Sequence, residues 1–179
     1  MSRVNLSRRV AIDALLCAFA MMLSYLEVLL PLTAWIPLPG FRLGLANLAV
    51  VAVFVLFSPI DAALVSLVRV LLMGLLFGSP TSLYFSFLGA LCSYLLLLLM
   101  RLIGKKLSYF GVSILSASAH NAGQILAAAT LFDFSLFYSY LPILLIAAVL
   151  FGGIVGALLN TLIPKLSKHT DRLVERRRV

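Results

Sequence analysis

The chain has 179 residues, of which 63% are hydrophobic and only 11% are charged, and its mean hydropathy is +1.15. Soluble domains carry about 25% charged residues, so this composition excludes a soluble enzyme, a soluble nucleic-acid-binding domain and a disordered chain. It predicts an all-α integral membrane protein with a single membrane domain over residues 1–179.

Six apolar segments follow one another along the chain, and most of them end at a proline, a glycine or a charged residue. They predict six transmembrane helices at Val10–Leu30, Leu45–Phe57 (with an extension back to Phe41), Ile60–Phe77, Leu83–Ile103, Tyr109–Phe132 and Phe137–Ile163. The second is the shortest, because even when it is extended back to Phe41 it measures only about 25 Å. A basic segment, residues 1–9, precedes the bundle of 10–163, and a basic tail, 164–179, follows it.

The positive charges test this number of helices, because Lys and Arg gather on the cytoplasmic side of membrane proteins. With six helices, 12 of the 14 basic residues share a side with both termini. These 12 are Arg3, Arg8, Arg9, Arg101, Lys105, Lys106, Lys165, Lys168, Arg172, Arg176, Arg177 and Arg178. We therefore expect a multi-pass protein of the cell membrane with cytoplasmic termini. Its basic ends would contact anionic lipid headgroups, with no nucleic-acid partner.

Polar side chains within apolar helices are costly, and each is therefore a candidate for a functional role. Most of those in this chain map to the outer half of the bilayer. The candidate substrate-binding residues are Glu27, Arg42, Asn47, Arg69, Tyr84, His120, Asn121 and Gln124. Asp13 and Asp61 fall near the inner ends of their helices, where a structural role is the simpler interpretation. The loop Pro31–Phe41, with Trp35, is expected to cover the site from outside.

The fifth segment carries the most informative pattern. Ser113, Ser116, His120 and Gln124 are spaced i, i+3, i+7 and i+11, which places them on one side of a helix. Such a stripe suits either a helix–helix interface or the wall of a polar cavity. Because Asn121 adds a third large polar side chain within about one turn, the pattern favours the cavity.

Arg69 keeps its positive charge in any surroundings, and so it needs a carboxylate, backbone carbonyls, water or an anionic ligand. By depth, Glu27 is the nearest carboxylate. Two explanations therefore stay open for Arg69, a structural ion pair with Glu27 and a ligand-binding role.

Several catalytic motifs are missing from the sequence. It has no phosphate-binding G-x-x-x-x-G-K-[ST] loop, no H-E-x-x-H, C-x-x-C or G-x-S-x-G, and no two adjacent acidic residues. Cys17 and Cys92 lie in apolar runs without disulfide or metal spacing. We therefore expect no metal, no cofactor and no enzymatic activity, and active transport would need an ion gradient or a partner ATPase.

Four stretches, Ser24–Glu27, Pro39–Val50, Ser66–Gly78 and Gly111–Gln124, together resemble the Gx transporter family, whose members are often labelled heptaprenyl diphosphate synthase component I. The resemblance runs in order over about residues 8–165. Its most specific part is the His-Asn-x-Gly-Gln element that ends at Gln124.

That family is similar to the S components of energy-coupling-factor (ECF) transporters, which are six-helix proteins that bind a vitamin-like substrate from outside the cell. The resemblance implies a transmembrane coupling subunit and ATPases as partners. In S components an A-x-x-x-A motif on the first helix contacts the coupling subunit, and Ala14 and Ala18 match that motif.

The leading hypothesis is a substrate-binding membrane subunit of a small-molecule uptake transporter, in which the partner supplies the energy. The alternative, suggested by the family label, is a membrane subunit in isoprenoid or polyprenyl diphosphate metabolism, such as the making of a menaquinone side chain. A quinone- or flavin-linked accessory role ranks last, because the sequence has no attachment site for such a group.

Overall fold

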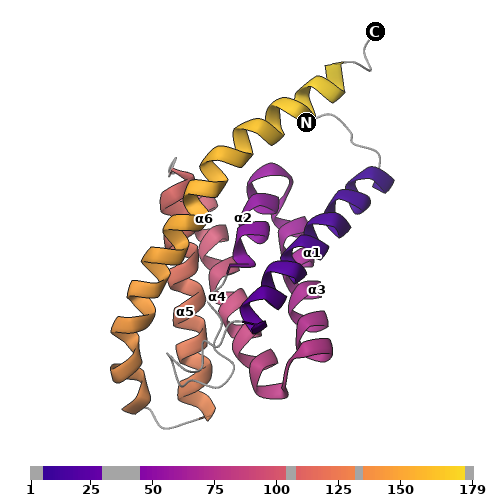
Figure 1. Cartoon of the computed structure of the whole chain (residues 1–179). Coiled ribbons are helices and arrows are strands. Elements are labelled where there is room, and N and C mark those ends of the chain that lie inside the picture. Colours follow the sequence, from indigo (N-terminus) through magenta and orange to yellow (C-terminus); the bar gives the residue numbers. More distant parts are fainter. Residues whose placement is uncertain (1–5, 30–44, 104–107, 132–134, 176–179) are drawn as a thin grey trace.

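The computed structural model describes residues 6–29, 45–103, 108–131 and 135–175, and side chains within 10–29, 45–103, 108–131 and 142–164. Over these residues the chain is all-helical (Figure 1). The helices are α1 Leu6–Leu29, α2 Asn47–Leu56, α3 Pro59–Phe77, α4 Pro80–Ile103, α5 Tyr109–Leu131 and α6 Ser135–Glu175. Because α1, α3, α4 and α6 are long and apolar enough to cross a bilayer, the protein is a multi-pass membrane protein.

The predicted helices are found in the predicted order, and α2 and α6 differ most from the predicted lengths. Helix α2 begins at Asn47, after a turn at Leu45 and Ala46, and so is about 15 Å long. The expected extension of this helix back to Phe41 is therefore wrong at Leu45 and Ala46, which form a turn. Residues 41–44 lie outside the described residues. Helix α6 does not end before Pro164 but continues to Glu175. Proline removes one backbone hydrogen bond and does not have to end a helix that packing supports.

Serine residues start three of the helices. Ser58 precedes Pro59, the first residue of α3, and its hydroxyl accepts a hydrogen bond from the Asp61 backbone N–H at 3.2 Å. Ser79 and Ser108 cap α4 and α5 in the same way. Serine at this position satisfies one of the free N–H groups of the first turn, and proline suits the turn itself. Asp61 therefore has the structural, helix-start role that the sequence suggested.

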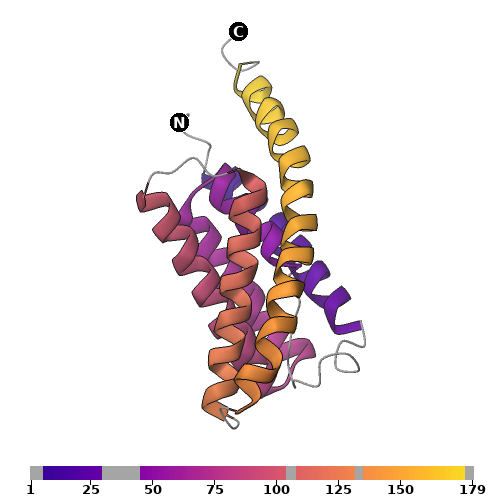
Figure 2. The same ribbon diagram turned by 90° about the vertical axis from the view of Figure 1, so that its left-hand side faces the viewer.

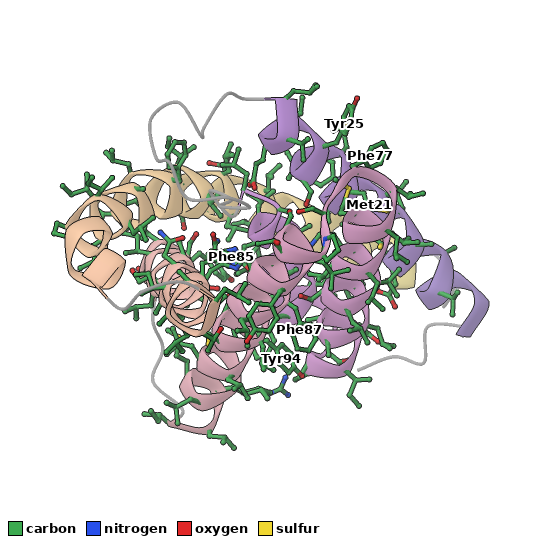
Figure 3. The ribbon with its side chains drawn as sticks, turned by 90° about the horizontal axis from the view of Figure 1, so that it is seen from below. Met21, Tyr25, Phe77, Phe85, Phe87 and Tyr94 are labelled. Carbon is green, nitrogen blue, oxygen red and sulfur yellow. The ribbon has the colours of Figure 1, made fainter. Side chains whose placement is uncertain are left out.

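Helix α2 is the centre of the bundle. It packs against every other helix, and its residues from Asn47 to Val53 are all buried. Viewed along the bundle, α1, α3, α4, α5 and α6 lie around it (Figure 3). A helix that is apolar on all sides is stable only when it is enclosed, which explains why the most uniformly apolar segment became the central one.

Consecutive helices run in alternating directions, so α1 starts and α6 ends at the same end of the bundle (Figure 1). We call this the basic end, because it holds the backbone positions of Arg8, Arg9, Lys165, Lys168 and Arg172. The last part of α6 extends beyond the other helices there (Figure 2). Short α2 occupies only the half of the bundle next to the basic end; the other half is called the far half.

Glycines bring α5 and α6 into close contact. A methyl group added at Gly152 would lie 2.8 Å from Ile114 Cα, and one added at Gly156 would lie 2.7 Å from Phe110 Cα. Both distances are shorter than an ordinary carbon–carbon contact of about 3.5–4.0 Å. The G-x-x-x-G motif of α6 therefore serves packing within the bundle.

Candidate functional site

Six buried polar side chains from four helices lie at or beyond the depth at which α2 begins. We call them the inner polar set: Ser24 and Glu27 on α1, Arg69 on α3, Ser86 on α4, and His120 and Gln124 on α5. Each is at most 6% exposed. Serine, glutamine and histidine can hydrogen-bond across helices in a membrane, but a set that also holds an arginine and a carboxylate calls for a functional explanation.

Two hydrogen bonds join α1 to α3 and to the turn that precedes α2. Arg69 Nη1 donates a hydrogen bond to Ser24 Oγ, 3.0 Å away. One turn further along α1, a carboxylate oxygen of Glu27 accepts a hydrogen bond from the Leu45 backbone N–H. The structure therefore brings Arg69 and Glu27 to the same turn of α1, and Glu27 ties the end of α1 to the turn that precedes α2.

Asn47 lies at the start of α2, where three helices are tied together. Its Nδ2 donates to Ser116 Oγ of α5 at 2.6 Å, and its Oδ1 accepts from Ser93 Oγ of α4 at 3.2 Å. The two serine hydroxyls are themselves 2.7 Å apart. This network fixes the depth of α2 in the bundle and separates the apolar half around α2 from the inner polar set.

His120 is packed against the backbone of α4. A methyl group added at Gly89 would lie 2.8 Å from His120 Cε1 and 2.9 Å from Nδ1. A methyl group added at Gly123, one turn along α5, would lie 2.8 Å from Gly89 Cα. The two glycines therefore allow α4 and α5 to approach closely, and Gly89 leaves the space that the imidazole occupies.

Asn121 faces α6. Its Nδ2 donates to the backbone oxygen of Leu144 at 2.7 Å. Its Oδ1 is buried and accepts no hydrogen bond from any residue that the structure describes. A buried oxygen without a partner costs about 1–3 kcal/mol, and such atoms in native structures need an explanation, for which a bound molecule is one candidate. Gln124, one turn further, is also buried.

Tyr84 does not join the inner polar set, and Arg42 cannot be compared with it. The Tyr84 hydroxyl lies 3.1 Å from Thr130 Oγ1 at the exposed edge of the α4–α5 contact. Arg42, together with the expected lid of Pro31–Phe41 and Trp35, lies outside the described residues.

Sequence reasoning overlooked a polar stripe on α4. Ser82, Ser86 and Ser93 are buried, and with Gly89 they are spaced i, i+4, i+7 and i+11. This is the same kind of signal as the stripe on α5, and it faces that stripe, because Ser93 contacts Ser116. Serine is common in membrane helices, which is why the pattern was easy to miss.

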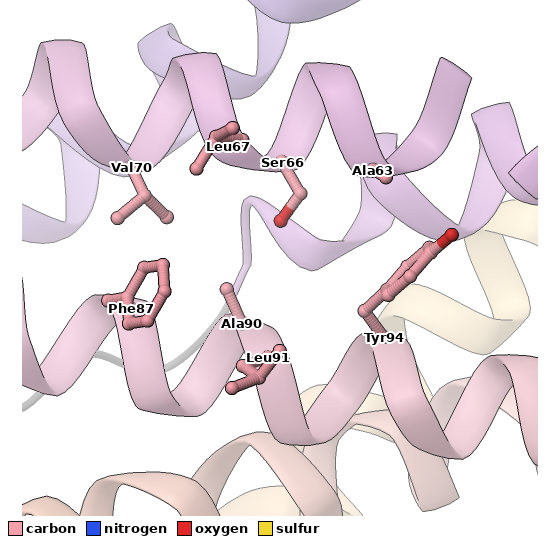
Figure 4. Close-up of a pocket in the computed structure, with 8 residues that line it drawn as sticks. All are labelled: Ala63, Ser66, Leu67, Val70, Phe87, Ala90, Leu91 and Tyr94. Carbon is pink, nitrogen blue, oxygen red and sulfur yellow. The ribbon is translucent and has the colours of Figure 1, made fainter. Parts of the chain in front are cut away.

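A separate groove lies between α3 and α4 (Figure 4). Its volume is about 290 Å³, and it is lined by Ala63, Ser66, Leu67, Val70, Phe87, Ala90, Leu91 and Tyr94. Leu67, Phe87 and Leu91 are 40–45% exposed, so the groove opens on the outer surface of the bundle. Its lining suits an apolar chain, and it contains none of the inner polar set.

Within the described part of the chain, no three His, Cys, Asp or Glu side chains lie close enough together to hold a metal ion. The inner polar set has instead the chemistry of a hydrogen-bonding site, with one arginine, one carboxylate, one imidazole, one amide and hydroxyl groups.

Comparison with known proteins identifies a family. No curated protein and no solved structure matches the chain. A family model described as heptaprenyl diphosphate synthase component I matches residues 16–162. The chain therefore belongs to this family, as its resemblance to the Gx transporter family predicted.

Proposed function

We propose that this protein is the substrate-binding membrane subunit of a small-molecule uptake transporter. One observation carries the proposal: six buried polar side chains from four helices lie at or beyond the depth at which α2 begins, one group on α1 and α3 and the other on α4 and α5. Two buried polar atoms at this depth, Ser86 Oγ and Asn121 Oδ1, have no hydrogen-bond partner among the described residues, and such atoms are expensive in a membrane. A polar small molecule would satisfy both atoms.

The distribution of charge supports an orientation for this site. The basic end carries the Lys and Arg residues near the start of α1 and the end of α6. By the positive-inside rule, we infer that this end is cytoplasmic in the cell membrane and that the far half faces outward. Substrate would then enter from outside, and Arg42 and the loop that contains it would lie on the side of entry.

A partner would supply the energy, because the sequence has no phosphate-binding loop of its own. The exposed side of α1 offers a place for such a partner. Ala14 and Ala18 are both exposed there, and small residues one turn apart allow another helix to approach closely. We infer that they contact a transmembrane coupling subunit, which in turn binds ATPases.

Substitutions at the site test the proposed binding. The protein would be purified from membranes in mild detergent, and the small molecules that co-purify with it would be identified by mass spectrometry. We expect His120→Ala and Arg69→Ala to lose the bound species while the protein still inserts and stays monodisperse. Ser118→Ala is the matched control on α5, because Ser118 Oγ bonds only its own helix, at the Ile114 carbonyl. Unchanged binding in both site variants would contradict the proposal.

The contact with a coupling subunit has a separate test. Ala14→Trp and Ala18→Trp add bulk on the exposed side of α1, so we expect both to block co-purification with the coupling subunit and to keep the bound small molecule. Leu26→Trp, at an exposed position near the other end of α1, is the control. Normal assembly of both alanine variants would refute this interface.

The family description and the apolar groove between α3 and α4 favour a second candidate function, a membrane subunit in polyprenyl diphosphate metabolism. The groove suits an isoprenoid chain. Prenyl transfer by the purified chain with magnesium would establish this function, and its absence together with a bound polar small molecule would favour uptake. Against catalysis by this chain alone, the sequence has no two adjacent acidic residues to hold magnesium and a diphosphate.

A further inference from the structure

Ser86 is a buried hydroxyl whose role the fold does not explain. It is 6% exposed, and its Oγ makes no hydrogen bond within the described parts of the chain. Burying a hydroxyl without a partner costs about 1–3 kcal/mol. Alanine, which is common at such positions, would avoid that cost.

Other hydroxyls in this bundle donate a hydrogen bond to a backbone carbonyl of their own helix. Ser118 Oγ donates to the Ile114 carbonyl at 2.9 Å, and Thr161 Oγ1 donates to the Ala157 carbonyl at 3.1 Å. This bond to the preceding turn is the usual choice for serine and threonine in a membrane helix. Ser86 does not make this bond, so its own helix leaves the hydroxyl without a partner.

The position of Ser86 in α4 shows which side the residue occupies. It lies seven residues from Ser93, which places both on the same side of the helix, and Ser93 contacts Asn47 and Ser116 in the interior. Ser86 is about 10 Å further from the basic end than Ser93. It therefore lies beyond the start of α2, at the depth of Gln124 on the neighbouring helix.

A second buried oxygen also lacks a hydrogen-bond partner among the described residues. Asn121 Oδ1, beside His120 in α5, belongs to a side chain that is 2% exposed, and the described residues supply no donor to it. An amide oxygen only accepts hydrogen bonds, whereas a hydroxyl accepts or donates. A molecule that satisfies both must present at least one N–H or O–H group.

We propose that Ser86 binds the substrate directly, and that the substrate is a polar small molecule with N–H or O–H donors, one of which reaches Asn121 Oδ1. This inference rests on the proposed function and narrows it. It assigns a binding role to Ser86, which the sequence pattern did not identify. A substrate that is purely hydrocarbon is excluded, because it has no N–H or O–H group to donate.

A thiol-accessibility experiment tests the position of Ser86 without knowledge of the substrate. In a Cys17→Ala, Cys92→Ala background, Ser86→Cys and Ser93→Cys would each be exposed to 2-aminoethyl methanethiosulfonate, a small water-soluble thiol reagent, and labelling followed by intact mass. We expect Ser86→Cys to react at least tenfold faster than Ser93→Cys, because Ser93 lies in the closed network around Asn47. Equal, slow labelling of two monodisperse variants would overturn the proposal.

A second measurement tests the role in binding and avoids the larger thiol. Ser86→Ala keeps the space and removes only the hydroxyl, so we expect it to retain at most a tenth of the co-purified small molecule, with Ser118→Ala as the control. If Ser86→Ala retained all of the co-purified small molecule, the role of Ser86 would be refuted. The proposed function would then still be tested by His120→Ala and Arg69→Ala. A co-purified species without an N–H or O–H group would refute the substrate class.

Discussion

Adjacent glycines in α6 give the sharpest test of the packing. A methyl group at Gly152 would lie 2.8 Å from Ile114 Cα and 3.2 Å from the Ser113 backbone oxygen. Neither atom belongs to a flexible side chain, so α5 and α6 must separate by about 0.7 Å or more to restore ordinary contact. Overpacking of this kind costs roughly 1–3 kcal/mol. We therefore expect Gly152→Ala to destabilise the protein by about that amount.

The neighbouring Gly153 is the matched control. A methyl group there would lie 3.5 Å from Phe110 Cζ, which is an ordinary contact. Alanine also favours the helix over glycine by up to about 1 kcal/mol. Gly153→Ala should therefore be neutral or stabilising, and the two variants should differ by about 2 kcal/mol, roughly 30-fold in the unfolding equilibrium constant.

Unfolding in mixed micelles with increasing sodium dodecyl sulfate, followed by circular dichroism, measures this difference. Equal stability of the Gly152 and Gly153 variants would refute the close contact of α5 with α6. A loss confined to Gly153→Ala would also refute it, because the closest approach of the two helices would then lie at Gly153.

Three further predictions concern the site and the helix ends. Asn47→Ala removes hydrogen bonds to two helices, each worth about 0.6 kcal/mol in a membrane, so the same titration should show a loss of about 1 kcal/mol; no loss would mean that the network does not fix α2. Ser58→Ala removes the cap of α3 and should cost about 1 kcal/mol, with Ser118→Ala unchanged. Gly89→Ala should displace the imidazole of His120 and reduce the co-purified small molecule more than it reduces stability, and a variant that only unfolds would contradict this.

The inner polar set was only partly predictable from the sequence. Glu27, Arg69, His120 and Gln124 were identified because charged and large polar side chains are conspicuous in apolar helices. Ser86 was missed because a serine gives no such signal by itself. Tyr84 was included because its position in the sequence places it in the outer half of the bilayer. That position does not tell in which direction the side chain points.

Composition and hydropathy by themselves determined that this is a helical membrane protein with six helices in this order, because a segment's apolarity and its breakers are local properties. The charges of the loops and tails likewise predicted that both termini share one end. Only the tertiary structure decided that α2 begins at Asn47 and is central, that Asn47 ties three helices together, and that α6 passes through Pro164. These features depend on which surfaces meet, and such contacts join residues that are distant in the sequence.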